Sequence, residues 1–128
     1  MIVLIRILGW FNIALVGVSF LPFLLRRFRK YVLKKPNKHL NAILKFLSKI
    51  HPFIGITLLI TSFLHGYLAL GTIKLHTGYV AWFLVLVMFS IRVWGKVSKS
   101  RYWMSLHRAV AMLLLLALLL HIFARSII

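Results

Sequence analysis

The sequence contains no aspartate and no glutamate among its 128 residues. Without carboxylate side chains, the chain lacks the paired acids of glycoside hydrolysis, the oxygen cages that hold calcium, and the usual acidic proton relays of membrane proteins. Cysteine is absent as well, which excludes disulfides, thiolate metal sites, iron–sulfur clusters and covalently attached c-type haem. Histidine, present six times, is therefore the main chemical resource of the chain.

What is present is strongly apolar and strongly basic. The chain is 62% hydrophobic, and its 17 Lys and Arg residues give a formal net charge of +17. The cations lie in short clusters between long uncharged runs, a distribution typical of the cytoplasmic loops of membrane proteins rather than of a nucleic-acid-binding surface. The composition predicts a multi-pass protein of the cell (plasma) membrane, in contact with membrane lipids and without nucleic acid as a partner.

Four apolar runs are long enough to cross a bilayer, where about 20 helical residues span the hydrocarbon. They predict a single all-α domain over residues 1–128, a four-helix transmembrane bundle with spans at 2–25, 50–70, 79–94 and 102–123.

Residues 26–49 hold nine of the cations and are expected to form a cytoplasmic loop. Apolar residues recur at helical spacing after Pro36, so an interfacial amphipathic helix is a second interpretation of this stretch. Pro52 is expected in the first turn of the second span, where its missing N–H is not needed.

The cations also predict the orientation of the chain. Nine lie in 26–49 and five lie in or near the loop before the fourth span, against three on the opposite side. Because cytoplasmic loops carry the excess of Lys and Arg, both termini are expected on the non-cytoplasmic side.

Two stretches of equal form carry the candidate chemistry. His51 and His65 lie fourteen positions apart on the second span, and His107 and His121 lie fourteen positions apart on the fourth. On a helix this spacing leaves two side chains within roughly 40° of each other and ~21 Å apart along the axis. Each helix therefore presents two imidazoles on one face, one near each edge of the hydrocarbon layer.

The second and fourth spans run in the same direction, so their like ends should meet. His51 is then paired with His107 at the inner level, and His65 with His121 at the outer level. Buried imidazoles in a bilayer usually mark a function, and two neutral imidazoles can serve as the axial ligands of a haem without any carboxylate. Zinc is less suitable because two ligands per level fall short of its usual three or four. A proton relay and simple hydrogen bonding between helices remain alternatives.

Other residues are candidates for supporting the cofactors. Gly55 and Ser62 share the face of the histidines and would clear space for a flat ring system, although small residues also serve close helix packing. Leu58 and Leu114 lie midway between the two levels and should fill the interval between them.

Basic residues near the two levels could hold haem propionates. Arg108 and Lys49 adjoin the inner histidines, where pairing with propionates and simple anchoring on the positive side are both open. His76 and Lys74 lie in the short loop near the outer level, where they could contact propionates or edge a pocket for a quinone or another oxidant.

The doubled histidine spacing, with one helix between the two ligand-bearing helices, resembles the transmembrane haem domain of ferric reductases and NADPH oxidases. The stretch Trp103-Met-Ser-Leu-His107-Arg108 is also similar to the start of a ligand-bearing helix in that group and in small bacterial di-haem cytochromes b. Over residues 50–124, the resemblance implies two haems b, one held by His51 with His107 and one by His65 with His121. Larger members have six helices and a flavin- and nicotinamide-binding domain, so the electron donor here is expected to be a separate molecule.

The leading hypothesis is thus a di-haem cytochrome b subunit that transfers electrons across the membrane between separate redox partner proteins or quinone. An electron-transfer cytochrome is favoured over a self-contained oxidoreductase. A membrane oxidoreductase that reacts with quinone or superoxide is one alternative. A non-redox structural subunit of a larger membrane complex is the other.

Overall fold

The computed structural model is an assembly of four long helices. It describes the backbone of residues 1–73 and 75–127 and the side chains of residues 1–73 and 75–124. The elements are α1 (Ile2–Phe28), which continues as the π-helical turn η1 (Arg29–Leu33), α2 (Lys38–Leu70), α3 (Thr77–Ser98) and α4 (Trp103–Ile127). Each of the four helices is long and apolar enough to cross a membrane, which confirms the predicted all-α bundle with four candidate spans.

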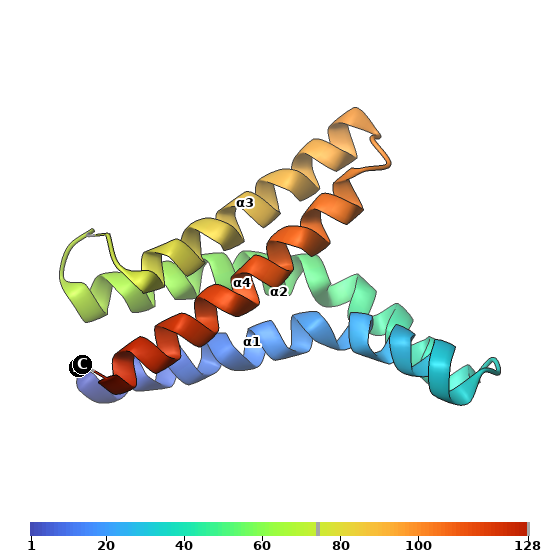
Figure 1. The fold of residues 1–128 in the computed structure, drawn as a ribbon, viewed down its shortest axis with the longest axis horizontal. Helices are drawn as coiled ribbons and strands as arrows, with labels where there is room; N and C mark the ends of the chain where they lie inside the picture. Colours follow the sequence, from blue (N-terminus) through green and yellow to red (C-terminus); the bar gives the residue numbers. More distant parts are fainter. Residues whose placement is uncertain (74, 128) are drawn as a thin grey trace.

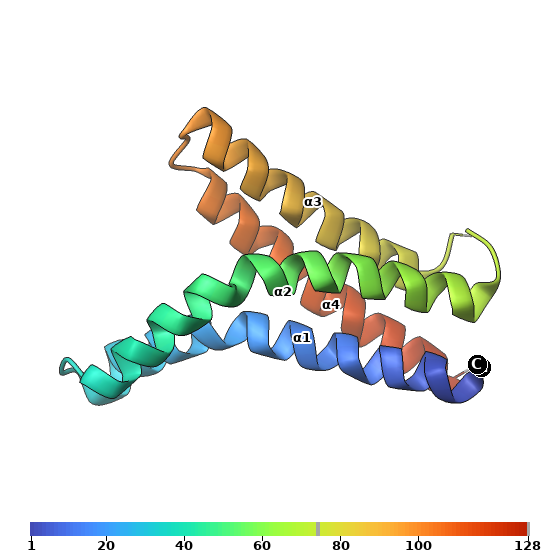
Figure 2. The same cartoon turned by 180° about the vertical axis from the view of Figure 1, so that it is seen from behind.

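The helices form two antiparallel hairpins, α1 with α2 and α3 with α4. Figures 1 and 2 show that the hairpins lie together at one end and diverge toward the other. The first end holds the start of α1, the end of α4 and the α2–α3 turn, and we call it the terminal end. The other holds the α1–α2 and α3–α4 turns with their clustered cations, and we call it the basic end.

One apolar core joins the two hairpins. Its buried members come from all four helices and are Val16, Leu58, Ala81, Val85 and Leu114. Leu114 is 3% exposed and Leu58 is 6% exposed, so the two leucines predicted to fill the interval between the histidine levels do lie in the core. Interdigitated side chains of this kind are what hold helices together in lipid, where burial of apolar area adds little.

Two polar contacts fix helix positions within this apolar region. The Thr61 hydroxyl donates to Asn12 Oδ1 at 2.6 Å, which satisfies the polar interruption of α1. Trp82 Nε1 on α3 donates to the Leu59 carbonyl on α2 at 3.1 Å. Each bond joins neighbouring helices, so α2 is fixed against both α1 and α3.

The basic stretch 26–49 differs from the expected loop, because most of it is helical. The Asn37 side chain accepts from the backbone N–H groups of His39 and Leu40, which caps α2 and starts the helix at Lys38. Leu40 and Leu44 are buried, so the apolar side of the helix stays packed beyond the hydrophobic span. The helical interpretation is therefore correct for residues 38–49, and this segment is continuous with the second span.

Prolines lie inside both helices of the first hairpin. Pro52 is in the interior of α2, so its expected place in a first turn is wrong. A proline inside a helix removes one backbone hydrogen bond and bends the helix, and α2 is visibly bent in Figures 1 and 2. The Arg26 to Ser48 hydrogen bond sets an antiparallel register in which Pro22 of α1 faces the level of Pro52. The two helices therefore have their proline positions at the same level.

Candidate cofactor site

The structure brings His51 of α2 and His107 of α4 together at the basic end. Their ring centroids are 6.2 Å apart, with an angle of 69° between the ring planes. Two imidazoles bound to opposite sides of one metal ion, each through a bond of about 2 Å, have ring centres roughly 6 Å apart. The spacing of this basic-end pair therefore suits a shared metal ion, as in a haem with two axial histidines.

The His107 ring is oriented by neighbours on α3 and α4. Its Nδ1 lies 3.3 Å from the Met88 carbonyl oxygen, and because a carbonyl only accepts, Nδ1 must carry the proton. In the neutral ring the lone pair is then on Nε2, the nitrogen that can bind a metal. The Trp103 indole lies 6.1 Å from the His107 ring, edge to face, and restricts its position from the same helix.

Two arginines act electrostatically on the basic-end pair. The positive charges of Arg92 and Arg26 would repel a positive charge on the His51 ring. Arg92 would likewise repel a positive charge on the His107 ring. The Arg92 guanidinium lies over the Trp103 ring, 5.1 Å from its centroid. These two arginines lie on other helices than the two histidines. Proximity in the sequence had instead indicated Arg108 and Lys49 as propionate partners, and both are exposed.

Gly55 and Ser62 leave room on the histidine face of α2. A Cβ added to Gly55 would meet no atom within 4 Å, so the space beside it is open. The Ser62 hydroxyl donates to the Leu58 carbonyl of its own helix, which satisfies it without a partner on another helix. Both residues are therefore compatible with a flat group beside α2.

At the terminal end, His65 is held by α1. Its Nδ1 lies 3.0 Å from the Ile5 carbonyl oxygen, so this nitrogen is the protonated one and the lone pair lies on Nε2. The ring also lies against Gly9, where an added Cβ would come within 3.1 Å of His65 Cε1. Gly9 thus allows α1 to approach the imidazole closely.

His121 is held in a similar way by α3. The Thr77 hydroxyl and His121 Nδ1 are 2.9 Å apart, and a Cβ at Gly78 would come within 3.2 Å of His121 Cε1. The His76 ring lies 5.7 Å from the His121 ring at an angle of 84°. His76 also caps α3, because its Nδ1 accepts from the Gly78 N–H at 3.3 Å. The expected place of His76 beside this level agrees with the structure, whereas Lys74 lies outside the described residues.

The sequence reasoning missed the groups that hold the terminal-end pair, His65 and His121. They are the Ile5 carbonyl, Gly9, Thr77 and Gly78. The two glycines could have predicted close packing against these histidines, because both lie near the end of a helix at the level of the histidines. Within the part of the chain that the structure describes, no group of three or more His, Cys, Asp or Glu could hold a metal ion. The histidine rings observed beside each other are His51 with His107 and His76 with His121.

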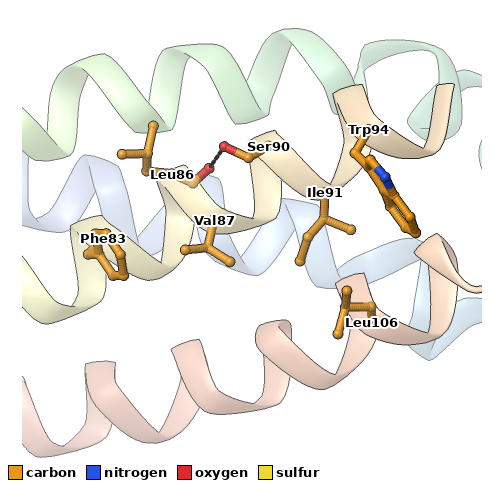
Figure 3. A pocket seen from close by; sticks show the side chains of 7 residues that line it. All are labelled: Phe83, Leu86, Val87, Ser90, Ile91, Trp94 and Leu106. Atoms are coloured by element: carbon orange, nitrogen blue, oxygen red, sulfur yellow. Dashed lines mark hydrogen bonds between the residues drawn. The ribbon is translucent and has the colours of Figure 1, made fainter. Parts of the chain in front are cut away.

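An apolar hollow lies elsewhere in the molecule. It has a volume of about 450 Å³ and is lined by Phe83, Leu86, Val87, Ser90, Ile91, Trp94 and Leu106, as Figure 3 shows. Its one hydroxyl, that of Ser90, donates to the Leu86 carbonyl of the same helix. None of the histidines lines this hollow, so it has no group for redox or acid–base chemistry.

Comparison with protein-family models, curated proteins and solved structures finds no match to this chain.

Proposed function

We propose that this protein is a transmembrane electron-transfer cytochrome that binds two haems b. His51 and His107 would be the axial ligands of one haem, and His65 and His121 those of the other. The observation that carries the proposal is the 6.2 Å spacing of the His51 and His107 rings, which come from two separate helices. It is the same pairing that the resemblance to ferric reductase and NADPH oxidase haem domains implies.

The hydrogen bonds of the rings support the same assignment. In His65 and His107, Nδ1 donates a hydrogen bond to a backbone carbonyl, which leaves the lone pair of the neutral ring on Nε2. Such bonds to the second nitrogen also fix the ring orientation and raise its basicity as a ligand. Each haem would supply an iron that gains and loses one electron.

Arg92 and Arg26 are the residues we assign to the propionates at the basic end. Their charges act on the basic-end histidines, and a guanidinium binds a carboxylate through two parallel hydrogen bonds. Because the sequence contains no Asp or Glu, a propionate would not compete with an acidic side chain for these arginines. Arg108 would then serve mainly as an anchor on the basic side.

The proposed orientation places the basic end in the cytoplasm and both termini outside, as the cation distribution predicts. Leu58 and Leu114 would keep the interval between the two levels free of water, since both are buried in the core. A separate donor and a separate acceptor, either a protein or a quinone, would act at the two faces.

The test is the haem content of the purified full chain. A pyridine haemochrome assay with a protein determination should give two haems b per chain. His51→Ala or His107→Ala should remove one haem, and His65→Ala or His121→Ala should remove the other. His39→Ala is the matched control. His39 is exposed near the start of α2, so this substitution should leave both haems in place.

Function is tested in proteoliposomes with an impermeant reductant outside and an impermeant acceptor inside. Electrons should cross with the intact protein and stop in the His65→Ala variant, which retains only the basic-end haem. A purified chain without haem would instead favour a non-redox structural subunit. Turnover with quinol or superoxide by the protein alone would favour the oxidoreductase alternative.

A further inference from the structure

The tip of the first hairpin forms a cationic cup, and the chain itself offers nothing to neutralise it. A hollow of about 560 Å³ is lined by five cationic side chains together with Pro36 and Asn41, and the cations are Arg26, Arg29, Lys30, Lys34 and Lys35. Because the sequence contains no Asp or Glu, no acidic side chain can pair with them. The counter-charge therefore comes from dissolved ions or from a bound molecule.

The backbone at the tip gives the cup a defined shape. The Lys34 N–H donates to the Arg29 carbonyl at 3.0 Å, which closes the π-helical turn η1. Lys34 then adopts a left-handed conformation with φ of 52°, uncommon for a residue other than glycine. Single π-helical turns are frequent at functional sites, because they place side chains where a regular helix would not.

Two arginines of the cup are held by polar groups of α2. Arg29 Nη1 donates to Asn41 Oδ1 at 2.6 Å, and Arg26 Nη2 donates to the Ser48 hydroxyl at 3.2 Å. Each contact uses one donor of a guanidinium that has five, so further donors remain for a ligand. Arg27, which does not line the cup, is placed differently, over the rings of Phe23 and Tyr31. The start of α2 adds the positive end of its helix dipole at the same tip.

The position of the cup identifies the source of the anion. The helical stretch Ile2–Leu33 has 32 residues. At ~1.5 Å per residue it is ~48 Å long, whereas the hydrocarbon layer is ~30 Å thick. The tip thus extends beyond the hydrocarbon to the level of the lipid headgroups. Phe28, Tyr31 and Phe46 are exposed near it, an arrangement of rings and cations typical of the interface. We infer that the cationic cup binds the phosphate group of an anionic phospholipid.

Retention of lipid by the full chain tests this inference. The purified protein is mixed with micelles containing equal amounts of phosphatidic acid and phosphatidylcholine, and native mass spectrometry measures the lipid that stays bound. We expect preferential retention of one phosphatidic acid. The double variant Arg29→Gln/Lys34→Gln should lower that retention at least tenfold, given about fivefold per basic residue near a membrane surface.

The matched control removes the same charge from the same hairpin. Lys45 and Lys49 are exposed on α2 and do not line the cup, so Lys45→Gln/Lys49→Gln should lower retention much less than the cup variant does. Circular dichroism should show equal helix content in both variants. Equal loss of phosphatidic acid in both double variants would overturn the inference, because only the net charge of the first hairpin would then matter. Binding of pyrophosphate as tight as that of phosphatidic acid, in lipid-free micelles, would overturn the lipid as the source.

Discussion

The two histidine pairs have the same spacing along the chain, but the structure holds them in different ways. At the basic end, the His51 and His107 rings lie beside each other, with their centroids 6.2 Å apart. At the terminal end, His65 and His121 are each bonded through Nδ1 to a neighbouring helix, α1 for His65 and α3 for His121. Flanking helices thus orient both terminal-end rings, whereas at the basic end α3 orients the His107 ring through the Met88 carbonyl.

This difference indicates separate roles for the flanking helices at the two levels. α1 and α3 contribute glycines and hydrogen-bond partners at the terminal end, where all four helices lie together. At the basic end, α3 contributes instead the Met88 carbonyl and Arg92, while the first hairpin leads away toward its cationic tip. Substitutions near the start of α1 should therefore affect mainly the terminal-end pair, and substitutions near the α3–α4 turn mainly the basic-end pair.

The largest effect is expected from Gly95→Ala. An added Cβ would overlap the Cβ and ring atoms of Trp103, so α3 and α4 would have to separate near the basic end. Overpacking of this kind costs about 1–3 kcal/mol of unfolding free energy, which unfolding of the purified protein by denaturing detergent would measure. The proposed basic-end haem should be lost with it, because Trp103 packs beside His107.

Gly66→Ala is the control for that substitution. Its Cβ would meet the Tyr79 ring at 3.5 Å, an ordinary van der Waals contact. It should leave the haem content unchanged and, through helix propensity, slightly stabilise α2. If both variants kept the same stability and two haems, close packing at Gly95 would have no bearing on the basic-end pair.

Gly9→Leu should have the next largest effect, at the other level. The added side chain would displace the His65 ring and break its 3.0 Å bond to the Ile5 carbonyl, at a cost of about 1–2 kcal/mol. The terminal-end haem should be lost and the basic-end haem retained. Gly17→Leu on the same helix is the control, since its Cβ would meet no atom within 4 Å. Loss of the basic-end haem in Gly9→Leu would contradict the separation of the two levels.

Thr77→Val should have a smaller effect, confined to the terminal end. It removes the hydroxyl that bonds His121 Nδ1 while preserving the shape of the side chain, which costs about 1 kcal/mol of stability. Loss of a hydrogen-bond partner of a metal-binding histidine typically weakens affinity by about 10- to 100-fold, measurable by haem titration. Thr57→Val is the control, because the Thr57 hydroxyl bonds only the Phe53 carbonyl of its own helix. Equal haem affinity in the two variants would mean that Thr77 does not support a ligand.

Much of this arrangement could be predicted from the sequence, and the rest could not for identifiable reasons. Hydropathy located the four spans, and the equal histidine spacing on two parallel spans predicted that His51 lies beside His107. Hydropathy failed over residues 38–49 because the helix there is stabilised by the Asn37 cap and by buried Leu40 and Leu44, not by a continuous apolar run. Contacts such as His65 with the Ile5 carbonyl depend on the register between helices, which no local pattern specifies.

The smallest effect on stability, and the sharpest test of the cofactor at the basic end, is expected from Gly55→Leu. The space beside Gly55 contains no atom within 4 Å of an added Cβ, so the substitution should change the unfolding free energy of the haem-free chain by less than about 0.5 kcal/mol. If that space accommodates a porphyrin beside His51, the leucine will occupy it and the haem content will fall from two to one. Gly17→Leu, also in open space but on the exposed side of α1, should keep both haems. A Gly55→Leu protein that still carries two haems would show that the open space serves no cofactor.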